Sequence, residues 1–115
     1  MYNIKLLNKI SQVGLDEFDT NYSYGEDVEN EDAILVRSAS LHDYDFNSNL
    51  KAIARAGAGV NNIPIEKCSE NGIVVFNTPG ANANAVKELV ICSLFLASRK
   101  IVESIKWVEG LKDDL

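Results

Sequence analysis

The feature that most constrains the fold of this chain is a set of short apolar runs, each ending at polar or glycine residues. Ala33–Val36 is continuously apolar and lies between Asp32 and Arg37. An uninterrupted run of this length predicts a strand that is covered on both faces, as in a parallel sheet. Alternating apolar residues predict a strand over residues 2–6. We predict further strands over the β-prone residues 21–25, over 50–55, and over 73–76, the last of them also buried.

Helical segments are expected between these strands. A short one is predicted around Val13–Phe18, and Pro64 suits the first turn of another that ends at Asn71-Gly72. Strands that alternate with helices predict an α/β fold with a mainly parallel sheet. Ligands bind such sheets outside the carboxyl ends of the strands. The residues in those places are Arg37-Ser38, Arg55–Gly59 and Asn77–Asn82.

The last third of the chain predicts one long helix over residues 84–109. Asn82 and Asn84 are its candidate N-caps, and Gly110 is its expected end. A continuous helix there has about 26 residues and a length of roughly 39 Å. Apolar residues recur along it at helical spacing: Val86, Val90, Leu94, Ala97, Ile101, Ile105 and Val108. One small domain cannot cover that length, so we expect the helix to pack against another domain or subunit.

Charge and length narrow the class of protein. The 115 residues allow one domain, and the net charge of −6 provides no basic footprint for nucleic acid or an anionic membrane. The acidic residues between positions 26 and 32 are interpreted as a solvated loop, since adjacent carboxylates repel one another. No apolar stretch is typical of a signal peptide or a membrane span; the longest, Leu89–Ala97, is interrupted by Ser93.

The cysteines and the single histidine argue against a catalytic or metal centre in this chain. Cys68 and Cys92 have no histidine near them in the sequence, and we expect both to be reduced and buried, as in a cytoplasmic protein. His42 lies among polar residues of a predicted surface turn. The sequence therefore offers no acid–base centre and no metal site.

Gly57-Ala58-Gly59 resembles the start of a dinucleotide-binding fingerprint but does not complete it. The third glycine of that pattern would fall at position 62, which is Asn62. The tripeptide instead offers backbone N–H groups without bulky side chains beside Arg55, an arrangement that can hold a carboxylate or phosphate. A tight turn that requires positive φ is the alternative explanation of the glycines.

Arg37 and Arg55 each follow an apolar strand. A guanidinium at a strand end can bind a carboxylate or phosphate through two hydrogen bonds. An ordinary ion pair with the abundant acidic residues is the alternative.

Three consecutive blocks resemble the D-isomer-specific 2-hydroxyacid dehydrogenases. They are residues 34–38 (Ile-Leu-Val-Arg-Ser), 53–63 and 72–79, and they occur in order and at the family's spacing within residues 33–108. Val-Arg-Ser together with Arg-Ala-Gly-Ala-Gly-Val is most similar to the 3-phosphoglycerate dehydrogenase branch, and residues 79–89 are similar to a bacterial version of it. The first 32 residues match the family poorly and look shortened.

The resemblance implies a two-domain NAD-dependent enzyme with a flavodoxin-like substrate domain. Residues 1–83 would be the N-terminal part of that domain, residues 84–109 the helix that links it to a nucleotide-binding domain and contributes to a homodimer, and residues 110–115 a truncated tail. The glycine fingerprint and the catalytic Arg, Glu and His of the family would lie beyond Leu115, so this chain alone is expected to be inactive.

The resemblance also implies roles for individual residues. Arg37, Ser38 and Arg55 match positions around the phosphoglycerate, and the Ala56–Gly59 backbone (Ala56, Gly57, Ala58 and Gly59) matches the loop that holds the substrate carboxylate. Ala58 stands where some relatives have a threonine that touches the cofactor. Asn82 matches an active-site asparagine.

Two other functions stay open at this point. The resemblance implies oxidation of 3-phosphoglycerate to 3-phosphohydroxypyruvate, and the first alternative is the same chemistry on another D-2-hydroxyacid such as glycerate or lactate, or the reduction of glyoxylate. The second is a receiver-like regulatory module, which shares this fold. A receiver needs acidic residues after its first strand and a phosphoacceptor Asp after its third, whereas this chain has Asn8-Lys9 and Arg37-Ser38 there.

Overall fold

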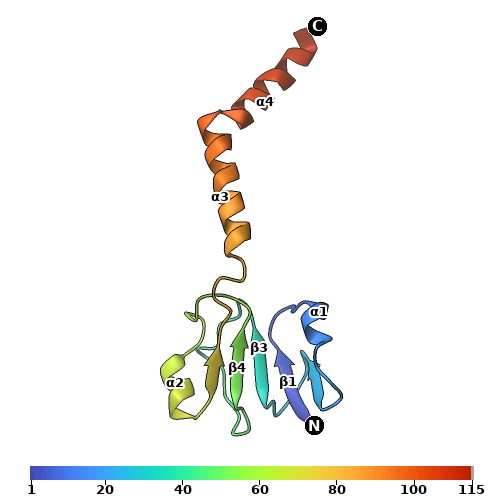
Figure 1. Ribbon diagram of the computed structural model, residues 1–115, viewed down its shortest axis with the longest axis vertical. Helices are drawn as coiled ribbons and strands as arrows, with labels where there is room; N and C mark the ends of the chain where they lie inside the picture. The colour runs from blue at the N-terminus through green and yellow to red at the C-terminus, as the bar shows by residue number, and fades with distance from the viewer. Residues whose placement is uncertain (115) are drawn as a thin grey trace. The chain divides into compact units, whose positions relative to one another are not determined.

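The computed structural model describes residues 1–114, which divide into two compact units, Met1–Ala81 and the segment from Asn82 on. The first unit holds five strands and two helices, and the second holds two helices and a terminal 3-10 turn (Figure 1). In chain order the elements are β1 (Tyr2–Leu6), α1 (Gln12–Leu15), β2 (Tyr22–Gly25), β3 (Ala33–Val36), β4 (Ala52–Arg55), α2 (Ile65–Glu70), β5 (Val74–Phe76), α3 (Ala83–Ser98), α4 (Ile101–Gly110) and η1 (Leu111–Asp114).

The strands form one sheet in the order β2-β1-β3-β4-β5, and every neighbouring pair is parallel. This is the strand order of flavodoxin-like folds, and it confirms the predicted α/β class. The order reverses between β1 and β3. The carboxyl ends of these two strands therefore flank the place where doubly wound sheets most often bind ligands.

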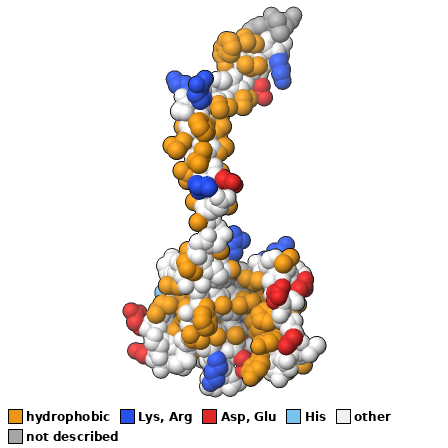
Figure 2. Space-filling model, in the orientation of Figure 1, with side chains coloured by type: hydrophobic (Ala, Val, Ile, Leu, Met, Phe, Trp, Pro, Cys, Tyr) orange, Lys and Arg blue, Asp and Glu red, His pale blue; other side chains and the backbone are white. Residues whose placement is uncertain are grey.

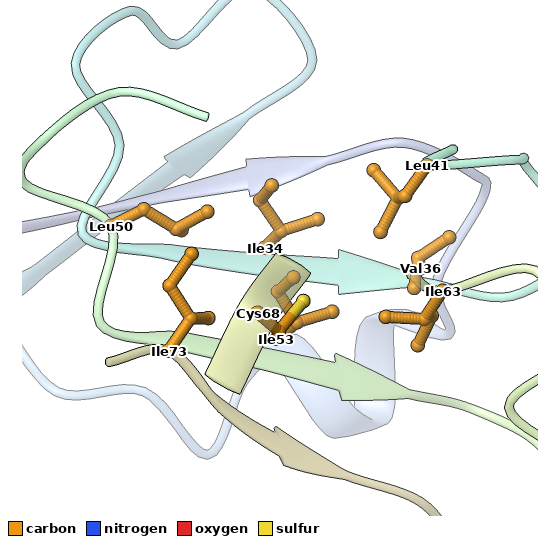
Figure 3. Close-up of a cluster of buried hydrophobic side chains, with 8 residues drawn as sticks. All are labelled: Ile34, Val36, Leu41, Leu50, Ile53, Ile63, Cys68 and Ile73. Atoms are coloured by element: carbon orange, nitrogen blue, oxygen red, sulfur yellow. The ribbon is translucent and has the colours of Figure 1, made fainter. Parts of the chain in front are cut away.

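The hydrophobic core lies between one face of the sheet and helix α2. Ile34 and Ile53 are paired in register on β3 and β4, and both are fully buried against Cys68 of α2 (Figure 3). The loops between the strands add the remaining buried side chains: Leu41, Leu50, Ile63 and Ile73, with Val36 at the end of β3. Gly72 ends α2 at a φ of 68°, as the Asn71-Gly72 signal predicted.

The opposite face of the sheet is covered at one end only. Phe18, just after α1, packs its ring against Tyr22 and Tyr24 of β2 at centroid distances of 5.2 and 6.0 Å. Farther along this face, Leu35 is half-buried and Phe76 of the edge strand β5 is 57% exposed. Hydrophobic side chains accordingly gather on the surface of the first unit in Figure 2. The predictions that β3 is covered on both faces and that β5 is buried were therefore wrong.

The acidic segment is only partly solvated. Glu26, Asp27 and Glu29 are exposed, but Glu31 is buried and accepts a hydrogen bond of 2.8 Å from the Tyr44 hydroxyl. Burial, and then the hydrogen bond to the Glu31 carboxylate, raise the pKa of Tyr44 far above its ordinary value. Asp32 accepts a hydrogen bond of 2.8 Å from the backbone N–H of Asn3. The interpretation of the whole run as a solvated loop was wrong at these last two acids, which anchor neighbouring segments.

The second unit contradicts the prediction of one continuous helix. α3 ends at Ser98, and α4 begins at Ile101 after Lys100, whose φ of 49° is left-handed. No glycine or proline marks this break. Asn82 does occupy the N-cap position of α3, but its side chain makes no capping hydrogen bond, and Asn84 lies inside the helix. Gly110 is the last residue of α4, as expected.

The two cysteines differ. Both are free, but Cys68 is buried and Cys92 is exposed, so the expectation that both are buried was wrong for Cys92. Burial raises the pKa of the Cys68 thiol above its ordinary 9.0, although the neighbouring Lys67 acts in the opposite direction. Among the described residues, no helix has the length and apolarity that a membrane crossing requires.

Candidate functional site

Four loops meet at the carboxyl edge of the sheet because its strands are parallel. The loop after β1 contains Asn8, the loop after β3 begins with Arg37-Ser38, the loop after β4 is Ala56–Val60, and β5 is followed by Asn77-Thr78. Side chains and backbone groups from these loops form a connected set of hydrogen bonds.

Arg55, the last residue of β4, binds backbone carbonyls on both sides of it. Its Nε donates to the carbonyl oxygen of Arg37 at 2.9 Å, and its Nη1 donates to the carbonyl oxygen of Gly59. Neither arginine takes part in an ion pair within the described residues, so the alternative of ordinary edge ion pairs finds no support there. Arg55 thus ties the end of β3 to the loop that follows β4.

The two glycines of this loop make room for the Arg55 guanidinium. A Cβ atom on Gly59 would lie 3.0 Å from Nη1 of Arg55, and one on Gly57 would lie 3.4 Å from its Cζ. Neither glycine has positive φ. The alternative of a tight turn that requires positive φ was therefore wrong, and close approach of the arginine explains the glycines instead.

The carbonyl groups of the Gly57–Gly59 loop are all occupied. Thr78 N–H donates to the carbonyl oxygen of Gly57 at 2.9 Å, Asn77 Nδ2 donates to that of Ala58 at 2.7 Å, and Arg55 Nη1 donates to that of Gly59. By contrast, within residues 1–114 the backbone N–H groups of residues 57–60 make no hydrogen bond. A run of unpaired backbone donors next to a guanidinium is suited to an anionic ligand.

The segment after β3 is anchored by Asn8, which was not among the site residues predicted from the sequence. The Oδ1 atom of Asn8 accepts hydrogen bonds from the backbone N–H groups of Arg37, Ser38 and Ala39, at 2.8, 2.9 and 3.0 Å. Arg37 and Ser38 are exposed, and their side chains make no hydrogen bond within the described chain. The signal was present, because Asn8 follows a predicted strand just as Arg37 and Arg55 do.

Two other residues stand apart from this set. Asn82 belongs to the second compact unit, so it is not placed together with the loops of the first. His42 is exposed, and its Nε2 lies 2.8 Å from the carbonyl oxygen of Asn61, which fastens two loops to each other. Within the part of the chain that the structure describes, no cluster of three or more His, Cys, Asp or Glu residues is arranged to hold a metal ion.

Comparison with models of protein families shows the family to which the chain belongs. The model of the D-isomer specific 2-hydroxyacid dehydrogenase catalytic domain matches residues 1–107. The chain belongs to this family. The match begins at residue 1 and therefore includes the first 32 residues, which we expected to fit the family poorly.

Several curated members of the dehydrogenase family are similar in sequence. Hydroxypyruvate reductase of Thermotoga maritima is 43% identical over 76 residues, which are 64% of this chain and 25% of that protein. D-3-phosphoglycerate dehydrogenase of Methanocaldococcus jannaschii is 34% identical over 104 residues, 88% of this chain and 20% of that protein. The corresponding enzyme of Archaeoglobus fulgidus is 41% identical over 81 residues, 68% of this chain and 15% of that protein. The chain thus spans a quarter or less of these relatives.

A solved structure shares the dehydrogenase fold. A dehydrogenase from Rhizobium meliloti superimposes with a TM-score of 0.73 over 93% of this chain and 44% of that chain, at 21% sequence identity.

At the carboxyl edge of this fold, the present chain offers hydrogen-bond donors: a guanidinium, a hydroxyl and a row of backbone N–H groups. Donors of this kind bind and orient an anion.

Proposed function

We propose that this chain is the substrate-binding portion of an NAD-dependent D-2-hydroxyacid dehydrogenase that oxidises 3-phosphoglycerate to 3-phosphohydroxypyruvate, a step of serine biosynthesis. The observation that carries the proposal is the loop after β4. Its carbonyl oxygens at Gly57, Ala58 and Gly59 are all engaged, while the N–H groups of residues 57–60 have no partner in the described chain.

Each donor has a proposed role toward a substrate that carries two anionic groups. The backbone N–H groups of Gly57, Ala58 and Gly59 bind the carboxylate, whereas the N–H of Ala56 already donates to the carbonyl oxygen of Val36 at 2.8 Å. The Arg37 guanidinium, which has no partner within residues 1–114, and the Ser38 hydroxyl bind the phosphate, whose oxygens suit a planar guanidinium. Arg55 holds the loop through Nε and Nη1, which leaves its Nη2 for the substrate.

A second candidate substrate is an unphosphorylated D-2-hydroxyacid such as glycerate. The similarity to the hydroxypyruvate reductase of Thermotoga maritima favours this candidate. Two arginines at neighbouring strand ends favour the phosphorylated substrate, because a carboxylate alone would use only one such site.

The proposed cofactor, NAD, would be held mainly by residues outside this chain. Ala58 is exposed, so its methyl group can make one contact with a cofactor. A dinucleotide also requires a glycine-rich turn for its pyrophosphate and an acidic residue for its ribose. The Gly57–Gly59 loop does not provide that turn, since its glycines pack around Arg55. We therefore propose that this chain by itself forms no NADH from 3-phosphoglycerate.

We propose a cytoplasmic location and a homodimer formed through residues 86–108, whose apolar side chains are exposed in the second unit. The proposed partners are then a small phosphorylated 2-hydroxyacid and a second copy of the chain. We propose no binding to nucleic acid or to a membrane.

Titration of the ¹⁵N-labelled chain with 3-phosphoglycerate and with D-glycerate tests the substrate. We expect 3-phosphoglycerate to shift the amide signals of residues 37–38 and 56–60. Arg37→Ala should weaken its binding by roughly 10- to 150-fold, because a hydrogen bond to a charged group contributes about 1.5–3 kcal/mol. Arg99→Ala, which removes an exposed arginine from the second unit, is the matched control and should have no effect.

The outcome separates the two candidates. If D-glycerate binds as tightly as 3-phosphoglycerate and Arg37→Ala leaves both affinities unchanged, the unphosphorylated substrate is the correct one. If neither compound shifts the signals of residues 56–60, the proposed anion site is wrong.

A further inference from the structure

We propose that Asn8 is a positioning residue of this anion site. We also propose that its side chain, because it is a neutral amide, favours the affinity of the site for a negatively charged ligand. The inference rests on the proposed function, because it concerns the Arg37 segment that would bind the phosphate. It assigns a role to a residue that does not itself contact the ligand.

The topology of the sheet brings Asn8 to this place. β1 and β3 are neighbours in the sheet although Asn8 and Arg37 are 29 residues apart. The pairing of the two strands continues past β1, since Leu7 N–H donates to the carbonyl oxygen of Leu35 at 3.0 Å. Asn8 therefore emerges beside the end of β3, at the point where the strand order reverses and ligands most often bind.

A single oxygen atom of Asn8 organises the segment after β3. Three successive N–H groups, those of Arg37, Ser38 and Ala39, converge on Oδ1 within 3.0 Å. Only an oxygen can accept these bonds, so the orientation of the amide is unambiguous. Converging backbone N–H groups form a concave site that elsewhere holds anions. Here the protein fills that site with its own side chain.

The result is a segment fixed from two sides. Asn8 accepts from the N–H of Arg37, and Arg55 Nε donates to the carbonyl oxygen of the same residue at 2.9 Å. The backbone of Arg37 is thus fixed while its guanidinium has no partner in the described chain. A donor on an ordered backbone loses less conformational freedom when it binds a ligand, so binding is tighter.

An amide and a carboxylate at position 8 would differ in their effect on the affinity for an anion. An aspartate at position 8 would be nearly isosteric, and its charged oxygen would hold the same three N–H groups more strongly. It would also add a negative charge beside the residue proposed to bind the phosphate. Order of the segment and affinity for the anion should therefore respond in opposite ways to Asn8→Asp.

The experiment compares Asn8→Ala and Asn8→Asp with the unmodified chain in two measurements. The first is hydrogen exchange of the Arg37, Ser38 and Ala39 amides without ligand. We expect about a tenfold loss of protection or more in Asn8→Ala, because a net hydrogen bond corresponds to about a factor of ten, and equal or greater protection in Asn8→Asp. The second is the affinity for 3-phosphoglycerate, which we expect both variants to weaken by about threefold to tenfold.

Asn47→Ala is the matched control. Asn47 also orders a loop, since its Nδ2 donates to the carbonyl oxygen of Glu31 and its Oδ1 accepts from Asn49 N–H, but it lies near the amino ends of the strands. Its loss should lower stability without changing the affinity. An equal loss of affinity in Asn47→Ala and Asn8→Ala would overturn the positioning role, because general destabilisation would then explain both.

The two measurements also separate this inference from the proposed function. Absence of any shift with 3-phosphoglycerate in the unmodified chain would contradict the proposed substrate. Unchanged protection of residues 37–39 in Asn8→Ala would overturn the role of Asn8 whatever ligand binds. An Asn8→Asp variant that binds 3-phosphoglycerate as tightly as the unmodified chain would overturn the role of the neutral amide.

Discussion

Among the individual residues, Arg55 fixes two backbone segments at the carboxyl edge of the sheet. Its Nε and Nη1 hold the backbone of Arg37 and of Gly59, so this side chain maintains the geometry of both proposed anion-binding loops. Substitution of Arg55 would accordingly disturb the site even if the guanidinium never touched the substrate. In the part of the chain that the structure describes, the side chain of Arg37 makes no such hydrogen bond, and Arg37→Ala is for this reason the cleaner test of substrate binding.

The packing of Arg55 leads to a prediction for Gly59→Ala. The new methyl group would lie 3.0 Å from Nη1, so the guanidinium must shift and lose its bond to the Gly59 carbonyl oxygen. We expect a destabilisation of about 0.5–1.5 kcal/mol, the net value of one hydrogen bond, measured by urea unfolding. Gly14→Ala is the control: nothing lies within 4 Å of its Cβ, and alanine in a helix should stabilise by about 0.5–1 kcal/mol. Equal stability of Gly59→Ala and the unmodified chain would mean that the arginine is not packed there.

At the scale of elements, the second unit shows how a helix can end without glycine or proline. α3 and α4 are separated by Arg99 and Lys100, and Lys100 adopts a left-handed conformation. For an L-residue this conformation costs about 1–2 kcal/mol. Glycine is free of that cost and is the residue that most often ends helices in this conformation.

Lys100→Gly therefore distinguishes a broken helix from a continuous one. With the break at Lys100, we expect the substitution to raise the stability of the unit by about 1 kcal/mol, seen as a higher Tm by circular dichroism. In a continuous helix, glycine would instead lower the stability by about 1 kcal/mol relative to alanine. Lys100→Ala serves as the control. A Tm order with the alanine variant above the glycine variant would contradict the break.

At the scale of the whole molecule, much apolar surface is left without a partner in the described chain. Leu94, Phe95 and Leu89 of α3 are each more than 60% exposed, and no side chain of α3 or α4 is buried. Contiguous apolar surface of this extent is rare on a monomer in water. A closed two-fold dimer is the commonest way to cover such a surface.

We therefore predict that the chain self-associates through residues 86–108. Replacing both Leu94 and Ile101 with aspartate should shift it toward the monomer, or unfold the second unit, because charges would enter the contact. Light scattering at around 100 µM measures the mass, and circular dichroism separates dissociation from unfolding. Asn84→Asp is the control, because it adds a charge to α3 at a polar position. A sharp monomer peak for the unmodified chain would show that these helices need no second copy.

Local patterns in the sequence were sufficient to predict the class of the fold and the part of the site that lies at the ends of β3 and β4. The apolar runs that form β3 and β4 can be recognised from consecutive residues. Arg37 is placed at the carboxyl edge because it follows β3, and Arg55 because it is the last residue of β4. A parallel sheet then brings both to one edge whatever else the chain does. The loop Gly57–Gly59 was located in the same way, although the reason for its glycines was not.

Contacts that depend on the order of the strands in the sheet could not be predicted from the sequence. Asn8 reaches Arg37 because β1 lies next to β3, and the buried Glu31 accepts a hydrogen bond from Tyr44, 13 residues farther along the chain. Likewise, the open face of the sheet follows from which helix packs on which side. The physical reason is that periodicity reports whether a residue suits a buried position, whereas its partner is set by competition among all possible pairings of distant segments. Such partners become visible when the sheet is assembled.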